Sequence, residues 1–177
     1  MKHVMLDLET WGTSVGSALR SIGMVQFDPR HAGFGKEFYC NLEFDDQKEL
    51  GATVDESTVK WWNLQGKEAT EVLQDNQLKL EDACNKVREF FYETKVAYVW
   101  AQGSNFDPVL LEQSFKFAKV KVPWRFYNTR DTRTCYNMTE LNTNLIKRQG
   151  TYHNALDDAK HQVRCVYKSY QIMDSKT

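Results

Sequence analysis

The chain has 177 residues, about the length of one domain. Hydrophobic residues make up 41%, aromatic residues 13% and charged residues 27% of it, which excludes a disordered or collagen-like chain. The 23 basic and 24 acidic residues give a formal net charge of −1, which excludes a protein that holds nucleic acid by bulk positive charge. Binding to nucleic acid would therefore need a local basic patch or bound metal ions.

No apolar run approaches the roughly 20 residues of a membrane-spanning helix, and the N-terminus lacks the pattern of a signal peptide. The cysteines, Cys40, Cys84, Cys135 and Cys165, are widely spaced and form no C-x-x-C pair. This favours buried free thiols in a reducing compartment over disulfides or a zinc site. We expect a single domain over residues 1–177, without membrane contact and with a cytoplasmic location.

The first part of the chain predicts strands. Residues 4–9 and 21–27 are short apolar segments, and residues 36–42 alternate apolar and polar side chains as a half-buried strand does. Their succession indicates an antiparallel meander. Residues 43–56 carry six acidic residues and one lysine, which predicts a solvated loop.

Helical and strand patterns alternate in the remainder. Apolar residues recur at helical spacing in residues 57–64, 78–91, 109–117 and 156–173. Dense apolar residues predict a buried strand over residues 96–101, and residues 124–128 are a further strand candidate. This order of elements predicts an α/β fold whose mixed β-sheet is flanked by helices.

Two acids stand out within the first predicted strand. Residues two apart on a strand point to the same face, so Asp7 and Glu9 project together while Leu6 and Leu8 face the other way. Burying two like charges side by side is unfavourable unless a cation neutralises them, and Mg²⁺ or Mn²⁺ suits carboxylate ligands. The alternative is that both acids lie in solvent at the end of the strand.

Three further residues have more than one interpretation when each is taken alone. Asp107 follows a predicted buried strand, where α/β sheets form ligand clefts, although an acid before Pro108 also suits a helix N-terminus. His153 and Asp158 stand at the start of the last predicted helix, where acids also complement the helix dipole. Their order along the chain is more informative than any one of them.

The motifs D-x-E, N-F-D and H-x-x-x-x-D occur in this order and cover most of the chain. In this the sequence resembles the DEDDh group of 3′–5′ exonucleases, which includes proofreading exonucleases, ribonuclease T and oligoribonuclease. Trp61-Trp62 and residues 129–134 are also similar to a compact subgroup of phage proteins, prophage exodeoxyribonuclease VIII-like proteins and mycobacterial exoribonucleases. One departure is Ser104, at a position where these enzymes often carry histidine.

The resemblance implies an RNase H-like fold in a single DEDDh exonuclease domain. It also implies four ligands for two divalent ions, Mg²⁺ or Mn²⁺, namely Asp7, Glu9, Asp107 and Asp158. Two such ions clamp the attacking and leaving oxygens of an in-line phosphoryl displacement. His153 would act as the general base, because imidazole titrates near neutrality. The reaction would release nucleoside monophosphates from the 3′ end of DNA or RNA, with single strands as the expected substrate.

The resemblance further suggests residues that contact the substrate. They are Leu8, Thr10, Trp11, Gly12, Trp61 and Phe106. Phe106 would stack on the terminal bases, unless it belongs to the core. Trp61 and Trp62 point about 100° apart on a helix, so we expect one in the core and the other in the cleft.

Five basic residues without an intervening acid are candidates for a strip that contacts phosphate. They are Lys116, Lys119, Lys121, Arg125 and Arg130. A solvated surface is the alternative explanation. The next residue, Asp131, is either a fifth acid near the site or a partner for Arg130 or Arg133, and the structural interpretation is favoured.

Two other functions compete with a nuclease. One is a catalytically silent nucleic-acid-binding module of the same fold, and the other is an interaction protein whose acids are caps and surface charges. The complete set of acids argues against a silent module, because a binder has no reason to keep negative charge where phosphate docks. The sequence does not distinguish RNA from DNA, nor a monomer from the homodimer that related small exonucleases form.

Overall fold

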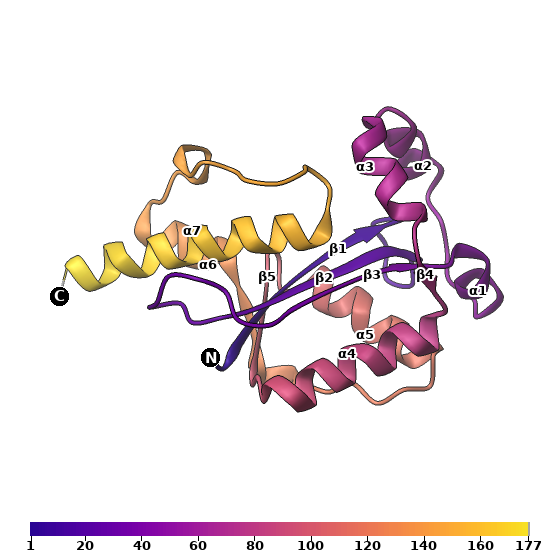
Figure 1. Ribbon diagram of the computed structural model, residues 1–177, viewed down its shortest axis with the longest axis horizontal. Coiled ribbons are helices and arrows are strands. Elements are labelled where there is room, and N and C mark those ends of the chain that lie inside the picture. The colour runs from indigo at the N-terminus through magenta and orange to yellow at the C-terminus, as the bar shows by residue number, and fades with distance from the viewer. Residues whose placement is uncertain (177) are drawn as a thin grey trace.

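The computed structural model describes residues 1–176, apart from the side chains of Glu68, Ala69 and Val72. Its centre is a six-stranded sheet in the order β4-β3-β2-β1-β5-β6 (Figure 1). The strands are β1 (His3–Thr10), β2 (Leu19–Phe27), β3 (Glu37–Leu42), β4 (Gln77–Leu78), β5 (Tyr98–Ala101) and β6 (Thr129–Asp131). β1, β2 and β3 pair antiparallel, whereas β5 runs parallel to β1, β6 to β5 and β4 to β3. The predicted meander and mixed sheet are confirmed.

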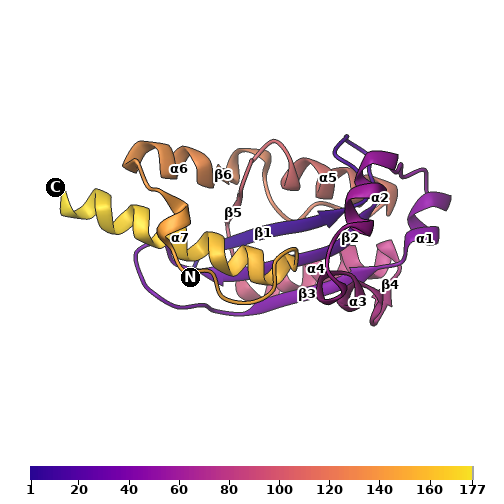
Figure 2. The ribbon, with the colours of Figure 1, turned by 90° about the horizontal axis from the view of Figure 1, so that it is seen from above.

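Helices cover both faces of the sheet. They are α1 (Phe44–Glu49), α2 (Glu56–Asn63), α3 (Lys67–Glu71), α4 (Leu80–Thr94), α5 (Asp107–Phe117), α6 (Thr132–Thr139) and α7 (Ala155–Ser175), with 3₁₀ turns η1 (Val72–Gln74), η2 (Phe126–Asn128) and η3 (Thr143–Leu145). α4 and α5 lie on one face, and α6 and α7 lie on the other (Figure 1). Seen from above, α7 runs along β1 and β2, while α1, α2 and α3 gather near the end of β1 (Figure 2).

Alternation along β1 divides the core into two clusters. Leu6 and Leu8 are buried against α4 and α5, whereas Met5 is buried against α7 on the opposite face. A fully buried side chain of this size contributes roughly 1.5–3 kcal/mol to stability. Asp7 and Glu9 follow Met5 at intervals of two residues, so they lie on the α7 face as predicted.

A glycine on β2 lets α7 approach the sheet beside these acids. Gly23 pairs with Asp7 across β1 and β2. A Cβ atom at Gly23 would lie 2.2 Å from the carbonyl carbon of Ala155 and 2.3 Å from the amide nitrogen of Leu156, closer than van der Waals contact allows. The first turn of α7 therefore packs directly on the backbone of β2, which fixes the height of α7 above the sheet.

The solvated loop predicted over residues 43–56 is only partly correct, because α1 forms within it. Gln47 of α1 is 1% exposed, and its side-chain amide bonds both the N–H and the C=O of Leu19, at 2.8 Å each. Gln47 is surrounded by acids in the sequence, so the local pattern did not indicate that it is buried. Its two bonds to Leu19 attach α1 to the start of β2.

The strand predicted over residues 124–128 is wrong. Residues 126–128 form η2, and β6 begins only at Thr129. Phe126 and Tyr127 gave the segment its apolar pattern, yet they are 83% and 54% exposed. α6 was not predicted, because its sequence TRTCYNMT contains few strong helix formers. Its N-terminus is instead stabilised by Asp131, which accepts bonds from the N–H groups of Arg133 and Thr134.

All four cysteines are buried free thiols, as expected. Burial raises the pKa of the Cys40 and Cys84 thiols to about 12, which leaves them protonated and unreactive at neutral pH. No helix among residues 1–176 combines the length and the apolar character needed to cross a membrane.

Candidate active site

Three elements bring the predicted acids together at one end of the sheet. β1 supplies Asp7 and Glu9, the first turn of α5 supplies Asp107, and α7 supplies Asp158. Glu9 is 8% exposed and Asp107 is 4% exposed, while the Asp158 side chain is 17% exposed. Because β1 and β5 are parallel neighbours, the end of β1 meets the loop that leads from β5 into α5. This is the edge where the sequence predicted a cleft.

Hydrogen bonds fix Asp107 and Asp7 in position. Asp107 accepts a bond of 3.1 Å from the backbone N–H of Leu8, which lies between Asp7 and Glu9 on β1. Asp7 accepts a bond of 2.6 Å from the Nε2 amide of Gln162 on α7. The backbone of β1 is thus linked to α5 through Asp107, and the Asp7 carboxylate is linked to α7 through Gln162.

Crowding of like charges perturbs the acids strongly. Burial, and then the charges of Asp107 and Glu9, raise the pKa of Asp7 well above its usual value. Burial and the charge of Asp107 raise the pKa of Glu9 to about 8, and burial raises the pKa of Asp107 to about 7. Such a cluster disfavours ionisation of all its members unless a cation neutralises it, which is the electrostatic property of a metal site.

One part of the cluster already has ligand spacing. Glu9, His153 and Asp158 each offer one donor atom, and these three atoms all lie within 4.8 Å of one another. The carboxylate oxygens of Glu9 and Asp158 suit Mg²⁺ or Mn²⁺, whereas an imidazole nitrogen is a more usual ligand of metals such as Zn²⁺.

His153 is held in an uncommon backbone conformation directly before α7. Its φ of 61° lies in the left-handed region, which non-glycine residues rarely adopt. The imidazole stands edge-on to the rings of Trp61 and Trp62, at centroid distances of 4.8 and 6.1 Å. Burial, and then the positive charge of Arg148, lower its pKa, so the ring is neutral at pH 7.

The two tryptophans have different environments. Trp62 is 2% exposed and donates from Nε1 to the carbonyl of Thr10 at 2.9 Å, whereas Trp61 is 41% exposed. Both line a cavity of about 280 Å³ next to Glu9, which also has hydroxyls from Thr13, Ser57 and Thr58. One tryptophan is buried and the other open, as predicted, and both contribute to the cavity wall.

The other suggested substrate residues are placed less directly. The Leu8 side chain lies in the core, and Phe106 is partly buried against the same cluster. Gly12 lies in a turn closed by a 2.7 Å bond from the Thr10 hydroxyl to its carbonyl. Trp11 stacks on the guanidinium of Arg20 at 4.0 Å. These contacts shape the end of β1 from behind the cavity.

Two of the five residues of the basic strip, Arg125 and Arg130, make contacts away from the acids. Arg130 lies over the ring of Tyr98 at 4.7 Å, and Tyr98 pairs with His3 at the opposite end of β1. Arg125 bonds Tyr127, beside the exposed turn η2. Asp131 accepts a 2.7 Å bond from the N–H of Ser104 and stabilises α6, so its structural interpretation is confirmed.

Four residues near the acids were missed in the sequence. Gln162 follows Asp158 by one helical turn, a spacing that could have identified it. Gly23 and Arg148 act through contacts between distant segments, which no local pattern reveals. Arg20 is 8% exposed between Trp11 and Trp62, with its guanidinium 4.0 and 4.1 Å from the two ring centroids.

Comparison with known proteins agrees with this geometry. The family model described as the 3′-5′ exoribonuclease Rv2179c-like domain matches residues 2–170. The nuclease domain of 3′hExo, a DEDDh family member bound to rAMP, superposes with a TM-score of 0.67 at 12% identity, over 96% of this chain and 91% of that one. No curated protein sequence matches the chain.

Two further solved structures share the fold. Pop2p of S. pombe, in its Mg²⁺ and Mn²⁺ bound form, has a TM-score of 0.56 at 14% identity, over 94% of this chain and 82% of that one. Product-bound exonuclease I has a TM-score of 0.59 at 14% identity, over 98% of this chain but 43% of that one. These matches confirm the RNase H-like sheet and helix arrangement, and none of them supports a phage origin.

Proposed function

The chain belongs to the Rv2179c-like 3′–5′ exoribonuclease domain family, and on that basis we propose that its carboxylate cluster is a two-metal active site for single-stranded RNA 3′ ends. The protein is a DEDDh-type 3′–5′ exonuclease, which removes the alternatives of a silent binding module and an interaction protein. We further propose that residues 1–177 form one catalytic domain. The observation that carries the proposal is the convergence of β1, α5 and α7 on one cluster of acids.

The side chains present fit a pair of divalent ions. Asp7, Glu9, Asp107 and Asp158 would hold Mg²⁺ or Mn²⁺, since raised carboxyl pKa values and oxygen donors favour a hard cation there. When bound, such ions stabilise the charge on the attacking and leaving oxygens of phosphoryl transfer. The carboxylates need no nucleophilic role, because water can attack the phosphate.

His153 is positioned to take the proton from the attacking water. A general base must be unprotonated before it acts, and the lowered pKa of His153 satisfies this at pH 7. The edge-on contact with Trp61 fixes the ring plane, while the partial exposure of the imidazole lets the proton leave to solvent afterwards.

The cavity beside Glu9 is the proposed site for the terminal nucleotide. The open face of Trp61 offers a stacking surface that accepts any base, which suits an enzyme that removes nucleotides without regard to sequence. The hydroxyls of Ser57 and Thr58 supply hydrogen-bonding partners for the ribose, and a 2′-hydroxyl is the group that distinguishes RNA from DNA.

A time course on end-labelled substrates tests the function. We expect 3′-labelled single-stranded RNA to lose its label first, in Mg²⁺ or Mn²⁺ and not in EDTA, with slower digestion of duplex RNA and of DNA. Loss of label from the 5′ end first would contradict the assigned polarity. Equal rates on RNA and DNA would contradict the proposed sugar preference.

His153→Ala tests the general base. We expect kcat to fall by about 100-fold, the lower end of general-base contributions, while affinity for Mn²⁺ changes little. His31→Ala is the matched control, because the His31 side chain is 77% exposed and pairs with Asp28 rather than with the acid cluster. A His153→Ala enzyme with the full rate at saturating Mg²⁺ would rule out this role.

A further inference from the structure

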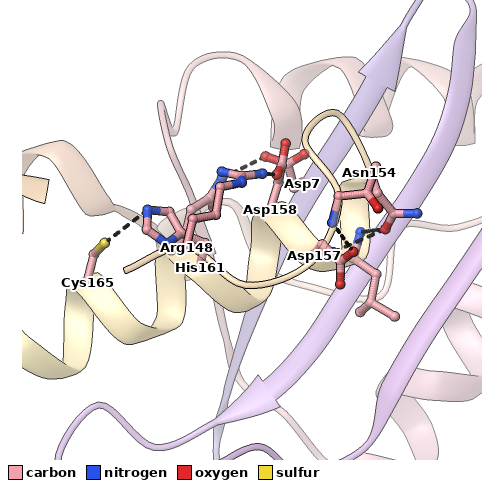
Figure 3. A network of polar contacts seen from close by, with 10 residues as sticks. Asp7, Arg148, Asn154, Asp157, Asp158, His161 and Cys165 are labelled. Carbon is pink, nitrogen blue, oxygen red and sulfur yellow. Dashed lines mark hydrogen bonds and ion pairs between the residues drawn. The ribbon is translucent and has the colours of Figure 1, made fainter. Parts of the chain in front are cut away.

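The segment between η3 and α7 brings an arginine into the acid cluster. Arg148 forms an ion pair with Asp158, and their side chains are only 18% and 17% exposed. Figure 3 shows the guanidinium beside Asp158 and Asp7, with His161 on its other side. The charge of Arg148 also acts on Asp7 and Glu9, where it favours the ionised carboxylates. Arg148 is therefore the cation paired directly with Asp158, while Arg20 and Arg133 act on Glu9 and Asp107.

Arg148 and a metal ion need the same carboxylate. Asp158 is one of the four proposed metal ligands, and its Oδ1 is the atom that contacts the guanidinium. We propose that Arg148 is an internal counter-ion that competes with divalent metal for Asp158, so that metal loading requires the guanidinium to leave this carboxylate. This inference rests on the metal site proposed above.

The surroundings of Arg148 allow the side chain to move while the loop stays in place. Gln149 accepts a 2.7 Å bond from Arg164, and the N–H of Thr151 bonds Asp157 at 2.8 Å, so the segment is held to α7 on both sides of Gly150. By contrast, the buried Nε of Arg148 has no hydrogen-bond partner within residues 1–176. An incompletely bonded guanidinium loses less on leaving its position than a fully bonded one does.

The ring of Tyr152 offers the guanidinium an alternative support. The Cζ of Arg148 lies 4.1 Å from the ring centroid of Tyr152, which is 64% exposed and directly precedes His153. A cation–π contact of this kind keeps the charge near the site after Asp158 is released.

Arg148→Met separates competition from a structural role. Methionine keeps an apolar stem beside Tyr152 but removes the charge. We expect Mn²⁺ to bind about tenfold more tightly, which lies within the range of coupling between two sites. We also expect the EDTA-treated variant to melt at a lower temperature than wild type, because Asp158 then lacks its cation, and this difference should shrink at saturating Mn²⁺.

Arg164→Met is the matched control. It removes the same charge from a residue that bonds the same loop through Gln149, and we expect unchanged Mn²⁺ affinity. Affinities are measured by calorimetry on EDTA-treated, dialysed protein, and folding is checked by circular dichroism. If Arg148→Met does not fold, Arg148→Lys replaces it, and because lysine lacks the planar guanidinium that contacts Asp158, we expect Mn²⁺ to bind more tightly than to wild type.

The outcomes distinguish the two proposals. If Asp158→Asn weakens Mn²⁺ binding but Arg148→Met binds Mn²⁺ no more tightly than wild type, the counter-ion role is overturned and the metal site stands. If Asp158→Asn leaves Mn²⁺ binding unaltered, both the metal site and the counter-ion role are overturned. Equal losses of melting temperature in Arg148→Met with and without Mn²⁺ would show that Arg148 is structural only.

Discussion

The two faces of β1 carry similar numbers of side chains in opposite environments, one apolar and one crowded with negative charge. On the face toward α4 and α5, Leu6 and Leu8 are buried among apolar side chains and stabilise the sheet. On the face toward α7, Glu9 is buried and Asp7 half-buried among other acids, and desolvation raises the pKa of both. One strand thus carries a stabilising face and a destabilising face, and the stabilising face holds the acids in position.

The largest expected effect is on activity, from a change on the acid face. Asp7→Asn keeps an oxygen that can accept the bond from Gln162 but removes the charge. We expect the rate of hydrolysis of 3′-labelled RNA to fall about 1,000-fold or more. This is the upper end of the rate loss seen when one group that stabilises the transition state electrostatically is removed. In EDTA the variant should melt no lower than wild type, since one repelling charge has gone. A substantially lower melting temperature would show that Asp7 stabilises the fold.

The complementary change is on the apolar face. Leu6 is 1% exposed, so Leu6→Ala leaves a cavity and should lower the free energy of unfolding by about 2–5 kcal/mol. Urea denaturation measures this loss. The rate per folded molecule at low temperature should stay close to that of wild type, and a large fall in that rate would mean that the two faces are not independent.

Gly23→Ala tests how α7 is held above the acid face. The added methyl group would meet the backbone of Ala155 and Leu156, so α7 must shift and carry His153 and Asp158 with it. We expect activity to fall by about 100-fold and stability by about 1–3 kcal/mol. Wild-type kcat in this variant would show that the position of α7 is not critical for the reaction.

The smallest effect is the pH dependence of stability in EDTA. The folded-state pKa is about 8 for Glu9 and about 7 for Asp107, above the values of roughly 4 in an unfolded chain. Between pH 4 and 8 the folded state therefore binds more protons than the unfolded state, so stability falls as pH rises through this window. Melting temperatures should decline by several degrees, and Asp107→Asn or saturating Mn²⁺ should flatten the curve. These pKa shifts would be contradicted if the melting temperature rose from pH 5 to 8 and rose by the same amount in Asp107→Asn.

Much of the fold was predictable because periodicity reports burial. The alternation of β1 placed Leu6 and Leu8 opposite Asp7 and Glu9, and the spacing over residues 156–173 identified α7 almost to its ends. The pattern failed over residues 124–128, where exposed aromatic side chains imitated a buried strand. Local periodicity cannot distinguish an apolar residue in the core from one in solvent.

The candidate site was predictable only as far as its motifs extend. Asp7, Asp107 and Asp158 lie in spaced motifs, whereas the contacts that place them depend on tertiary structure. Gly23 matters because a distant helix touches its backbone, and Arg148 matters because an irregular loop returns to α7. Neither residue has a neighbour in sequence that indicates its role.

The docking of α7 on Gly23 also bears on when the enzyme becomes active during synthesis. Chains fold from the N-terminus as they leave the ribosome, so β1, β2 and α5 emerge well before α7. Until α7 packs on the sheet, Asp7 and Glu9 have neither Asp158 nor His153 beside them. If His153 and Asp158 have the roles proposed above, we expect a growing chain to be unable to degrade RNA, its own message included, until α7 has been made and has folded.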